Sequence, residues 1–389
     1  MHYQNVCLET LGYTIPDEVV TSAAIEERLH PLYSRLKLSP GRLELITGVR
    51  ERRFWQEGTL PSEVSIESCQ KAISDSRIPI EKIGALIHGS VCRDHLEPAT
   101  ACRVHHGVGL RSDCTIYDTS NACLGILNGI LQAANMIELG QVEAALVVGT
   151  EGSRQLVEAT IDSLNRDEAL TRHSIKSAIA SLTIGSASCA VLLTHRDISQ
   201  TQNRIHTATT FANTRFHELC HSGKDEAAAD GMAPLMTTDS ETLMREGIMT
   251  GKETFHQFLE QTGWKIGDID KSFCHQVGTT HRKLMLESLG MSPEIDFLTV
   301  DWLGNTGSAA LPTTLAIGLE NGFVTAKDHV ALLGIGSGIN CLMMGIDFET
   351  VPDRANLKKP HFCSKPQAEE PNPRSLKPKT AQTPTKTVV

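Results

Sequence analysis

The passage from about residue 110 to residue 151 constrains the fold of this chain more than any other. It opens with the strand-like run CTIYD, and a turn at Thr119 and Ser120 follows. Apolar residues then recur at helical spacing and predict a helix buried on most sides; they are Leu124, Ile126, Leu127, Ile130, Leu131, Ala134 and Ile137. Gly140 supplies a helix stop, and AALVVGTEG resumes as a buried strand. The passage therefore predicts a β-α-β unit of about 35 residues.

Strand-like and helix-like runs also alternate elsewhere in the chain. ALIHGSVC precedes the helical ATACRVHHGVG, IDKSFCHQ leads into HRKLMLESLG, and IDFLTVD runs into GNTGSAALPTTLAIGLENG. This alternation predicts a layered α/β protein of two similar halves, residues 1–199 and 200–350, as internal duplication would produce. Within the second half, residues from about 200 to 256 are polar and weakly periodic, and we expect them to form a lid or a channel wall.

Charge is distributed unevenly along the 389 residues. The net charge is −10, although residues 354–389 hold eight Lys and Arg against two Asp and Glu. The remaining body is acidic, so nucleic acid is not expected as a partner. Residues 351–389 are polar, rich in proline and without a hydrophobic period, which predicts a disordered basic tail.

The sequence carries no signal for secretion or for a membrane anchor. The N-terminal MHYQNVCLET lacks the basic start and apolar core of a signal peptide, and no apolar run approaches 18 residues. The eleven cysteines have no CxxC pair and no regular spacing, which fits a reducing compartment better than a disulfide framework. We therefore expect a cytoplasmic protein without an integral membrane segment.

Cys123, in DTSNACLGIL, lies where a predicted strand gives way to a predicted helix. If the helix begins near Ala122, the thiol lies in its first turn, where unpaired N–H groups and the helix dipole favour the thiolate. Gly125 removes a side chain nearby and lets another segment approach the backbone. This position fits a nucleophile, and the alternative is a small core residue that happens to lie there.

Two polar residues of the second half are also predicted at strand ends. His275 ends a predicted strand in CHQVGTTHR, and Asn305 follows one in LGNTGSAALP. A cysteine that exchanges thioesters needs donors for a developing oxyanion, which these side chains can supply. A lone histidine is usually structural and GNTG alone can be a simple turn. Together with Cys123, however, they place three polar residues at strand ends, where sites in layered α/β folds assemble.

The set resembles the condensing enzymes of the thiolase superfamily, and most of all the ketoacyl-synthase III type. The resemblance rests on Cys123 in NACLG, His275 in HQ, Asn305 in GNTGSAALP and the closing GIGSG. In addition, TGVRERRFW is similar to the TGIRER segment of that family, and LVVGTEG to its strand after the nucleophile helix. The similarity covers roughly residues 5–347.

The resemblance implies a five-layered αβαβα fold of two similar halves, and a homodimer. It implies that an acyl-CoA or acyl-carrier-protein (acyl-ACP) thioester acylates Cys123, and that a second thioester then attacks in a Claisen condensation. His275 and Asn305 would hold the carbonyl of the second thioester as its enolate forms. The backbone N–H groups of Cys123 and Ser337 would hold the other oxyanion. The resemblance implies no metal, and no cofactor besides the thioester substrates.

The chain departs from the family pattern in two places. Relatives specialised for carrier-protein substrates show HQAN, whereas this chain has HQVG, with Gly278 in place of the asparagine. A tryptophan and an arginine that help the bacterial fatty-acid enzyme to bind coenzyme A are replaced by Arg42 and Ile46. The coenzyme A contacts are therefore not carried over, and Arg282 is the candidate basic contact.

Glu97, in VCRDHLEPATACR, resembles a glutamate of the OleA-type members of the family. Those enzymes join two acyl-CoA molecules without prior decarboxylation, and this glutamate reaches the active site from the partner subunit. Without loss of carbon dioxide some base must remove an α-proton, and a carboxylate with a raised pKa in a desolvated pocket can do so. The alternative is a surface glutamate ahead of a proline turn.

Two hypotheses for the reaction follow from the resemblance. OleA-like, non-decarboxylative condensation of acyl-CoA is favoured, because Glu97 is present. The alternative is a decarboxylative 3-oxoacyl-ACP synthase III that uses malonyl-ACP in fatty-acid biosynthesis. A catalytically inactive family member is disfavoured, because Cys123, His275 and Asn305 are all present.

Two other motifs suggest different classes of protein. HELCH, residues 217–221, fits the H-E-x-x-H pattern that binds zinc on a helix in hydrolases. Its surroundings are polar, short of helical periodicity and without an obvious third ligand, so zinc hydrolysis is a remote alternative. GIGSG lacks the G-x-G-x-x-G order and leads into a strand, so it does not predict a nucleotide-binding loop.

Overall fold

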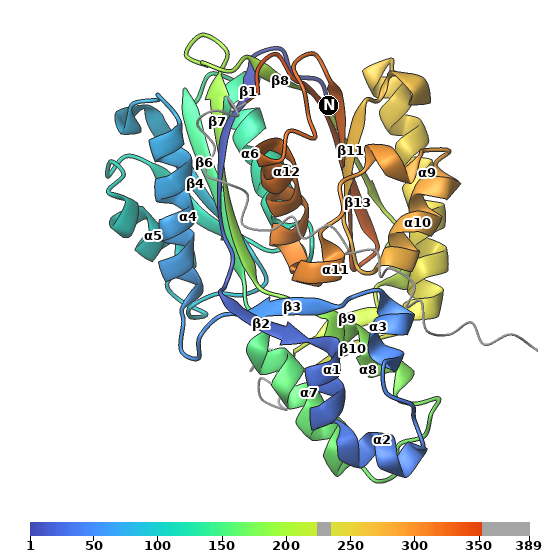
Figure 1. Ribbon diagram of the computed structural model, residues 1–389. Helices are drawn as coiled ribbons and strands as arrows, with labels where there is room; N and C mark the ends of the chain where they lie inside the picture. The colour runs from blue at the N-terminus through green and yellow to red at the C-terminus, as the bar shows by residue number, and fades with distance from the viewer. Residues whose placement is uncertain (224–234, 352–389) are drawn as a thin grey trace, which may run out of the picture.

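The computed structural model describes residues 1–223 and 235–351, which form five alternating layers of helices and sheets. Figure 1 shows two central helices between two sheets, and further helices on the outer face of each sheet. The predicted tail, except for Val351, and residues 224–234 of the predicted lid lie outside the described residues.

The first sheet comes from the N-terminal half. Its strands are β1 (Val6–Thr14), β4 (Ile83–Gly89), β5 (Thr115–Thr119), β6 (Ala144–Glu151) and β7 (Ala187–His195), in the order β1-β7-β6-β4-β5. β4 pairs in parallel with β5 and with β6, whereas β7 is antiparallel to both of its neighbours. The carboxyl ends of β4, β5 and β6 therefore lie at one edge. The β-α-β unit predicted around Cys123 is confirmed.

The second sheet comes from the C-terminal half. Its strands are β8 (Asn203–Ala212), β11 (Lys271–Cys274), β12 (His329–Gly336) and β13 (Asn340–Asp347), in the order β11-β12-β13-β8. β11 and β12 are parallel, so the segments after Cys274 and after Gly336 leave the sheet in the same direction. A short antiparallel pairing of β1 with β8 joins the two sheets.

Helices α6 (Gly125–Glu138) and α12 (Ala310–Glu320) form the middle layer. Both are apolar on most sides, and this explains their central position, because a helix that is hydrophobic all round must be buried all round. Helices α4 (Pro61–Asp75) and α5 (Thr100–Val108) cover the outer face of the first sheet. Helices α9 (Ser240–Thr262) and α10 (Thr279–Ser288) cover the outer face of the second.

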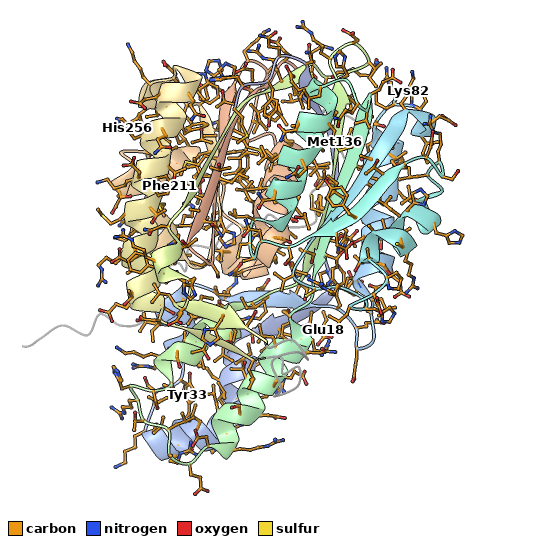
Figure 2. The ribbon with its side chains drawn as sticks, turned by 180° about the vertical axis from the view of Figure 1, so that it is seen from behind. Glu18, Tyr33, Lys82, Met136, Phe211 and His256 are labelled. Carbon is orange, nitrogen blue, oxygen red and sulfur yellow. The ribbon has the colours of Figure 1, made fainter. Side chains whose placement is uncertain are left out.

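Shorter elements form a cap at the end of the sheets where the strands β4, β6 and β12 finish (Figure 1). The cap has its own hydrophobic cluster. The elements of the cap are α1 (Ser22–Arg28), α2 (His30–Leu36), α3 (Arg42–Thr47), α7 (Arg154–Arg166), α8 (Lys176–Ile179), β2 (Glu18–Thr21), β3 (Glu51–Phe54), β9 (Cys220–Ser222) and β10 (Met236–Thr238). Figure 2 shows Tyr33 within this cap, and His256 on α9 at the outer surface.

The structure corrects the limits of the polar segment predicted at residues 200–256. Its first part is β8, which pairs along its length with β13, and its last part belongs to the long helix α9. The expectation failed because β8 is rich in threonine. Thr207 and Thr209 are buried in the sheet, where β-branched side chains pack well even though their hydroxyls make the sequence look polar.

The described residues also bear on the expectation about membranes. Within residues 1–223 and 235–351, no helix combines the length and the apolar character that spanning a bilayer requires.

Candidate active site

Cys123 lies in a tight turn between β5 and α6. The Leu124 N–H donates to the Asn121 carbonyl at 2.9 Å and the Gly125 N–H to the Ala122 carbonyl at 3.3 Å. Ala122 has a positive φ of 46°. The helix begins only at Gly125, so the expectation that it begins near Ala122 is wrong. The thiol precedes the first turn of α6 instead of lying within it.

The ionisation expected for Cys123 is also corrected. Burial, with smaller contributions from Glu151 and Cys220, raises the pKa of the Cys123 thiol to about 12. Because desolvation penalises the charged form, it outweighs any help from the helix end. Cys123 is therefore a neutral thiol in the resting site, and its proton must leave as an acyl group arrives.

The turn between β12 and β13, which contains Ser337, packs against the turn of Cys123. A Cβ atom added to Gly336 would lie 3.4 Å from the Cys123 nitrogen, so the two backbones are in contact. Asn340 Nδ2 lies 3.1 Å from Asn121 Oδ1 and 3.3 Å from the Ser337 carbonyl oxygen. The two backbone N–H groups predicted to bind an oxyanion thus belong to two turns that meet.

His275 follows β11, as predicted, and its N–H donates to the Leu333 carbonyl of β12 at 3.0 Å. The side chain is buried, and within the part of the chain that the structure describes neither ring nitrogen has a hydrogen-bond partner. Burial, with a smaller contribution from His281, lowers the pKa of His275 to about 3. The ring is therefore neutral, with one N–H and one lone pair available to a ligand.

Asn305 is buried, but it does not follow a strand. It lies between α11 (Val300–Leu303) and α12, and a single bridge pairs it with Ile184. Its N–H donates to the Thr183 carbonyl at 2.9 Å. Its Oδ1 accepts the Gly307 N–H at 3.0 Å. Since the amide oxygen is occupied in this way, Nδ2 is the group left to donate to a ligand.

Hydrogen bonds connect the segments that carry these residues. Gln276, next to His275, accepts the N–H groups of Thr299 and Val300 at 3.0 and 3.1 Å, just ahead of Asn305. On the other side, the Ser308 hydroxyl oxygen lies 3.0 Å from the Gly89 carbonyl oxygen at the end of β4. The structure thus brings the segments of Cys123, His275 and Asn305 to the same end of the two sheets.

Glu151, the last residue of β6, is a buried residue of the site that was not predicted from the sequence. Its side chain is buried, with 5% exposed, and accepts hydrogen bonds from residues 91, 92 and 308. The signal was present in the sequence, because the residue is the acid that ends an otherwise apolar strand in AALVVGTEG.

Glu97 differs from the other predicted side chains in its exposure to solvent. It is exposed, in the loop between β4 and α5, and it precedes Pro98. Within the described residues, no hydrogen bond or ion pair of the structure links Glu97 to Cys123, His275 or Asn305 of the same subunit.

Arg282 does not fit a substrate contact. Its guanidinium is buried and pairs with Asp296 at 2.6 Å, and it also donates to the carbonyl groups of Pro293 and Asp296. Asp296 in turn accepts from Ser272 and from the Cys274 N–H. Arg282 therefore serves the packing of α10, and the sequence-based expectation is corrected.

The HELCH segment does not have the geometry of a zinc site. His217 and Glu218 lie in a turn and His221 lies in β9, so the two histidines do not share one face of a helix. All three side chains are exposed. Among the described residues, no three histidine, cysteine or acidic side chains cluster as metal ligands.

Comparison with known proteins identifies related sequences over most of the chain. The family model of 3-oxoacyl-(acyl-carrier-protein) synthase III matches residues 117–213, and the model of its C-terminal part matches residues 259–347. The acyl-CoA:acyl-CoA alkyltransferase of Shewanella oneidensis is 41% identical over 89% of this chain and 99% of its own length. That of Xanthomonas campestris is 33% identical over 88% and 98%. A beta-ketoacyl-(acyl-carrier-protein) synthase III of Bradyrhizobium diazoefficiens is 26% identical over 84% and 94%.

Solved structures agree with the sequence relatives. A crystal structure of Xanthomonas campestris OleA matches with a TM-score of 0.84 and 32% identity, over 90% of this chain and 98% of that chain. Another OleA structure, with bound lauric acid and lauroyl-CoA, matches with a TM-score of 0.83 over 89% and 100%. The expected thiolase-like fold is confirmed. The chain belongs to the 3-oxoacyl-(acyl-carrier-protein) synthase III family of thiolase-like condensing enzymes.

Proposed function

We propose that this condensing enzyme joins two acyl-CoA molecules in a Claisen condensation, through an acyl group carried on Cys123. One observation carries the choice of reaction. The solved OleA structures include variants at a cysteine and at a glutamate that are 26 positions apart, and Glu97 and Cys123 are also 26 positions apart. The greater identity to acyl-CoA:acyl-CoA alkyltransferases than to the Bradyrhizobium ketoacyl synthase supports the same choice.

In the first step, Cys123 Sγ attacks the carbonyl carbon of an acyl-CoA. The bond between that carbon and the sulfur of coenzyme A breaks, and the thiol proton of Cys123 leaves with the coenzyme A. The developing oxyanion lies against the N–H groups of Cys123 and Ser337. Fixed donors of this kind act only as charge develops, and the loss of one typically costs about 100- to 1,000-fold in rate.

In the second step, a carboxylate removes an α-proton from the second acyl-CoA. The enolate oxygen is held by the ring N–H of His275 and by Nδ2 of Asn305, both of which lack protein acceptors in the described residues. The α-carbon attacks the acyl carbonyl, the bond to Cys123 Sγ breaks, and a β-ketoacyl thioester results. A neutral His275 suits this role, because it donates a hydrogen bond without giving up its proton.

The base is Glu97 of the partner subunit in a homodimer. Two features support this assignment. β5 is the last strand of its sheet, and within residues 1–223 and 235–351 its outer edge has no partner strand. The adjacent loop exposes Val91 at 45% and Leu96 at 46%, so it offers apolar surface to a second copy. Glu97 lies in this exposed loop and would enter the site of that copy.

The alternative reaction is decarboxylative condensation with malonyl-ACP. Decarboxylation creates the carbanion directly, so no base is needed, and Glu97 would have no role. The similarity to ketoacyl synthases is the observation behind this alternative.

Purified enzyme supplied only with lauroyl-CoA distinguishes the two reactions. We expect free coenzyme A and a β-keto product, detected by thiol titration and mass spectrometry, and we expect Cys123→Ala to form neither. Condensation that begins only after malonyl-ACP is added would refute the proposed reaction and support the alternative.

A further inference from the structure

Glu151 is the buried acid of the site to which no step of the reaction has been assigned. Its Oε1 accepts the Ser308 hydroxyl at 2.6 Å, the Ser308 N–H at 3.3 Å and the Val91 N–H at 3.1 Å. Its Oε2 accepts the Cys92 N–H at 3.3 Å. A buried carboxylate must be compensated in this way, because an unpaired charge in the interior is costly. Four donors from two separate loops therefore meet at one side chain.

The first of these loops orients Asn305. Gly307 packs on Glu151 so closely that a Cβ atom at Gly307 would lie 3.1 Å from Glu151 Cγ. The Gly307 N–H holds Asn305 Oδ1, and Ser308 is bound to the carboxylate by both its N–H and its hydroxyl. The contact with Glu151 therefore fixes the turn that leaves Nδ2 of Asn305 free to donate.

The second loop carries Glu97. The first residues of this loop, 90–92, are bound to the end of β6. Glu151 accepts the N–H groups of residues 91 and 92, and the Ser90 hydroxyl donates to the Thr150 carbonyl at 2.7 Å. The Gly152 N–H donates to Cys92 Sγ at 3.3 Å. Glu97 follows five residues after Cys92. The start of the loop is thus held in place by hydrogen bonds, whereas Glu97 itself is exposed.

We propose that Glu151 is a positioning residue, whose carboxylate holds the Asn305 turn of its own site together with the loop that presents Glu97 to the site of the partner. This role rests on the proposed function, since it assigns Glu97 to the partner's reaction. It means that each subunit fixes the enolate donor of one site and the base of the other through the same side chain.

Glu151 also acts on Cys123 by its charge, which gives the role a separate readout. The charged or titratable neighbours that influence the Cys123 thiol are Glu151 at the end of β6 and Cys220 in β9, and both raise its pKa. Removal of the Glu151 charge should therefore lower that pKa. A buried acid remote from the thiol, such as Glu9, would not shift it.

The test is Glu151→Gln, which keeps the shape and removes the charge. We expect the pH profile of Cys123 alkylation by iodoacetamide, followed by mass spectrometry of the peptide that contains Cys123, to move to lower pH. Acylation of Cys123 by lauroyl-CoA should persist. Condensation should fall on the order of 100-fold, the usual effect of displacing a reacting group by about 1 Å.

Glu9→Gln is the matched control. Glu9 is equally buried, at 5% exposed, and accepts bonds from Thr194, Ser199 and Gln200 on the far part of β1 and its neighbours. The Glu9→Gln variant should have the wild-type alkylation profile and the wild-type ratio of condensation to acylation. An equal loss in both variants, or an unaltered Glu151→Gln enzyme, would overturn the proposal.

Ser308→Ala provides a second route if Glu151→Gln does not fold. It removes the 2.6 Å bond but keeps the charge, so we expect slower condensation with no shift of the alkylation profile. Normal condensation in this variant would contradict the role of the turn. If the wild-type enzyme condenses only with malonyl-ACP, the proposed reaction fails, and the hold of Glu151 on Asn305 is then measured with that substrate.

Discussion

Gly125 and Gly89 meet backbone to backbone beside the nucleophile. A Cβ atom on Gly125 would lie 2.8 Å from the carbonyl carbon and oxygen of Gly89, and a Cβ atom on Gly89 would lie 2.5 Å from the Gly125 carbonyl oxygen. The end of β4 therefore supports the first residue of α6 with no side chain between them. The close approach predicted from Gly125 is confirmed, and Gly89 is the residue that approaches it.

Replacement of Gly125 by alanine should displace the turn that carries Cys123. The new methyl group meets backbone atoms, which cannot rotate away, so the turn or β4 must move. We expect acylation of Cys123 by lauroyl-CoA to slow on the order of 100-fold, measured as the rate of mass increase. Gly267→Ala is the control, because a Cβ atom there meets nothing within 4 Å. Acylation of Gly125→Ala at the wild-type rate would contradict this prediction.

Buried histidines should make the fold sensitive to acid. Burial lowers the pKa of His88 to about 4, of His275 to about 3 and of His281 to about 4. In the unfolded chain each titrates near 6.5, so below that pH the unfolded state binds more protons than the folded state. The stability that these neutral rings contribute is fully present above pH 6.5 and is lost as the pH falls towards about 4.

His88→Gln should reduce this sensitivity while leaving the site intact. His88 lies on the outer side of β4, where its ring contacts the Ser65 hydroxyl at 3.3 Å. Between pH 6 and pH 4.5, the free energy of unfolding should fall less steeply in the variant, by about 1.4 kcal/mol for each pH unit. Urea denaturation at several pH values measures this slope. His256→Gln, at an exposed position, should retain the wild-type slope.

Arg282 should prove structural. Its side chain is 10% exposed and that of Asp296 is 0% exposed, so removal of the cation leaves a buried carboxylate unpaired. We expect Arg282→Gln to lose about 3–5 kcal/mol of unfolding free energy, because breaking a buried pair costs far more than losing a surface pair. The KM for lauroyl-CoA should not change in the folded fraction. Lys283→Ala, at the exposed neighbouring position, is the control and should be as stable as the wild type. If Arg282→Gln instead raised the KM for lauroyl-CoA without a loss of stability, Arg282 would be a substrate contact after all.

Local patterns were sufficient to predict much of the fold. The helical spacing after Cys123 and the apolar run of β6 are local signals, and the structure has these elements where they were predicted. His275 at the end of β11 follows from the same signals. Such features depend on neighbouring residues in the chain, so the sequence reveals them directly.

Features set by distant contacts could not be read in this way. Asn305 was expected after a strand, but among the described residues IDFLTVD makes one isolated sheet bridge, between Asp296 and Ser272. The Asp296 side chain pairs with Arg282, a contact that no local pattern of the sequence reveals. The high pKa of Cys123 likewise depends on burial by other segments. The role inferred for Glu151 requires loops more than 150 residues apart in the sequence to meet, which no local period encodes.

The exposed position of Glu97 leads to a prediction about the proposed homodimer. Glu97→Ala should still be acylated at Cys123, because the first step needs no α-proton removal, yet it should form no condensation product. Cys123→Ala should form no product either, because it cannot carry an acyl group. Intact-protein mass spectrometry after exposure to lauroyl-CoA separates the two defects.

Mixing the two inactive variants tests whether the base comes from the partner. In a heterodimer, the Glu97→Ala subunit has a working Cys123, and the Cys123→Ala subunit supplies a normal Glu97 across the interface, so one of the two sites is complete. If equal amounts are unfolded together and refolded, half of the dimers are mixed, and activity should return to about a quarter of the wild-type value. The same mixture without refolding, assayed before subunits exchange, is the control and should stay inactive. If Glu97 acted in its own subunit, neither site of the heterodimer would be complete. A refolded mixture that forms dimers like the wild type but makes no product would therefore show that the partner subunit does not supply the base.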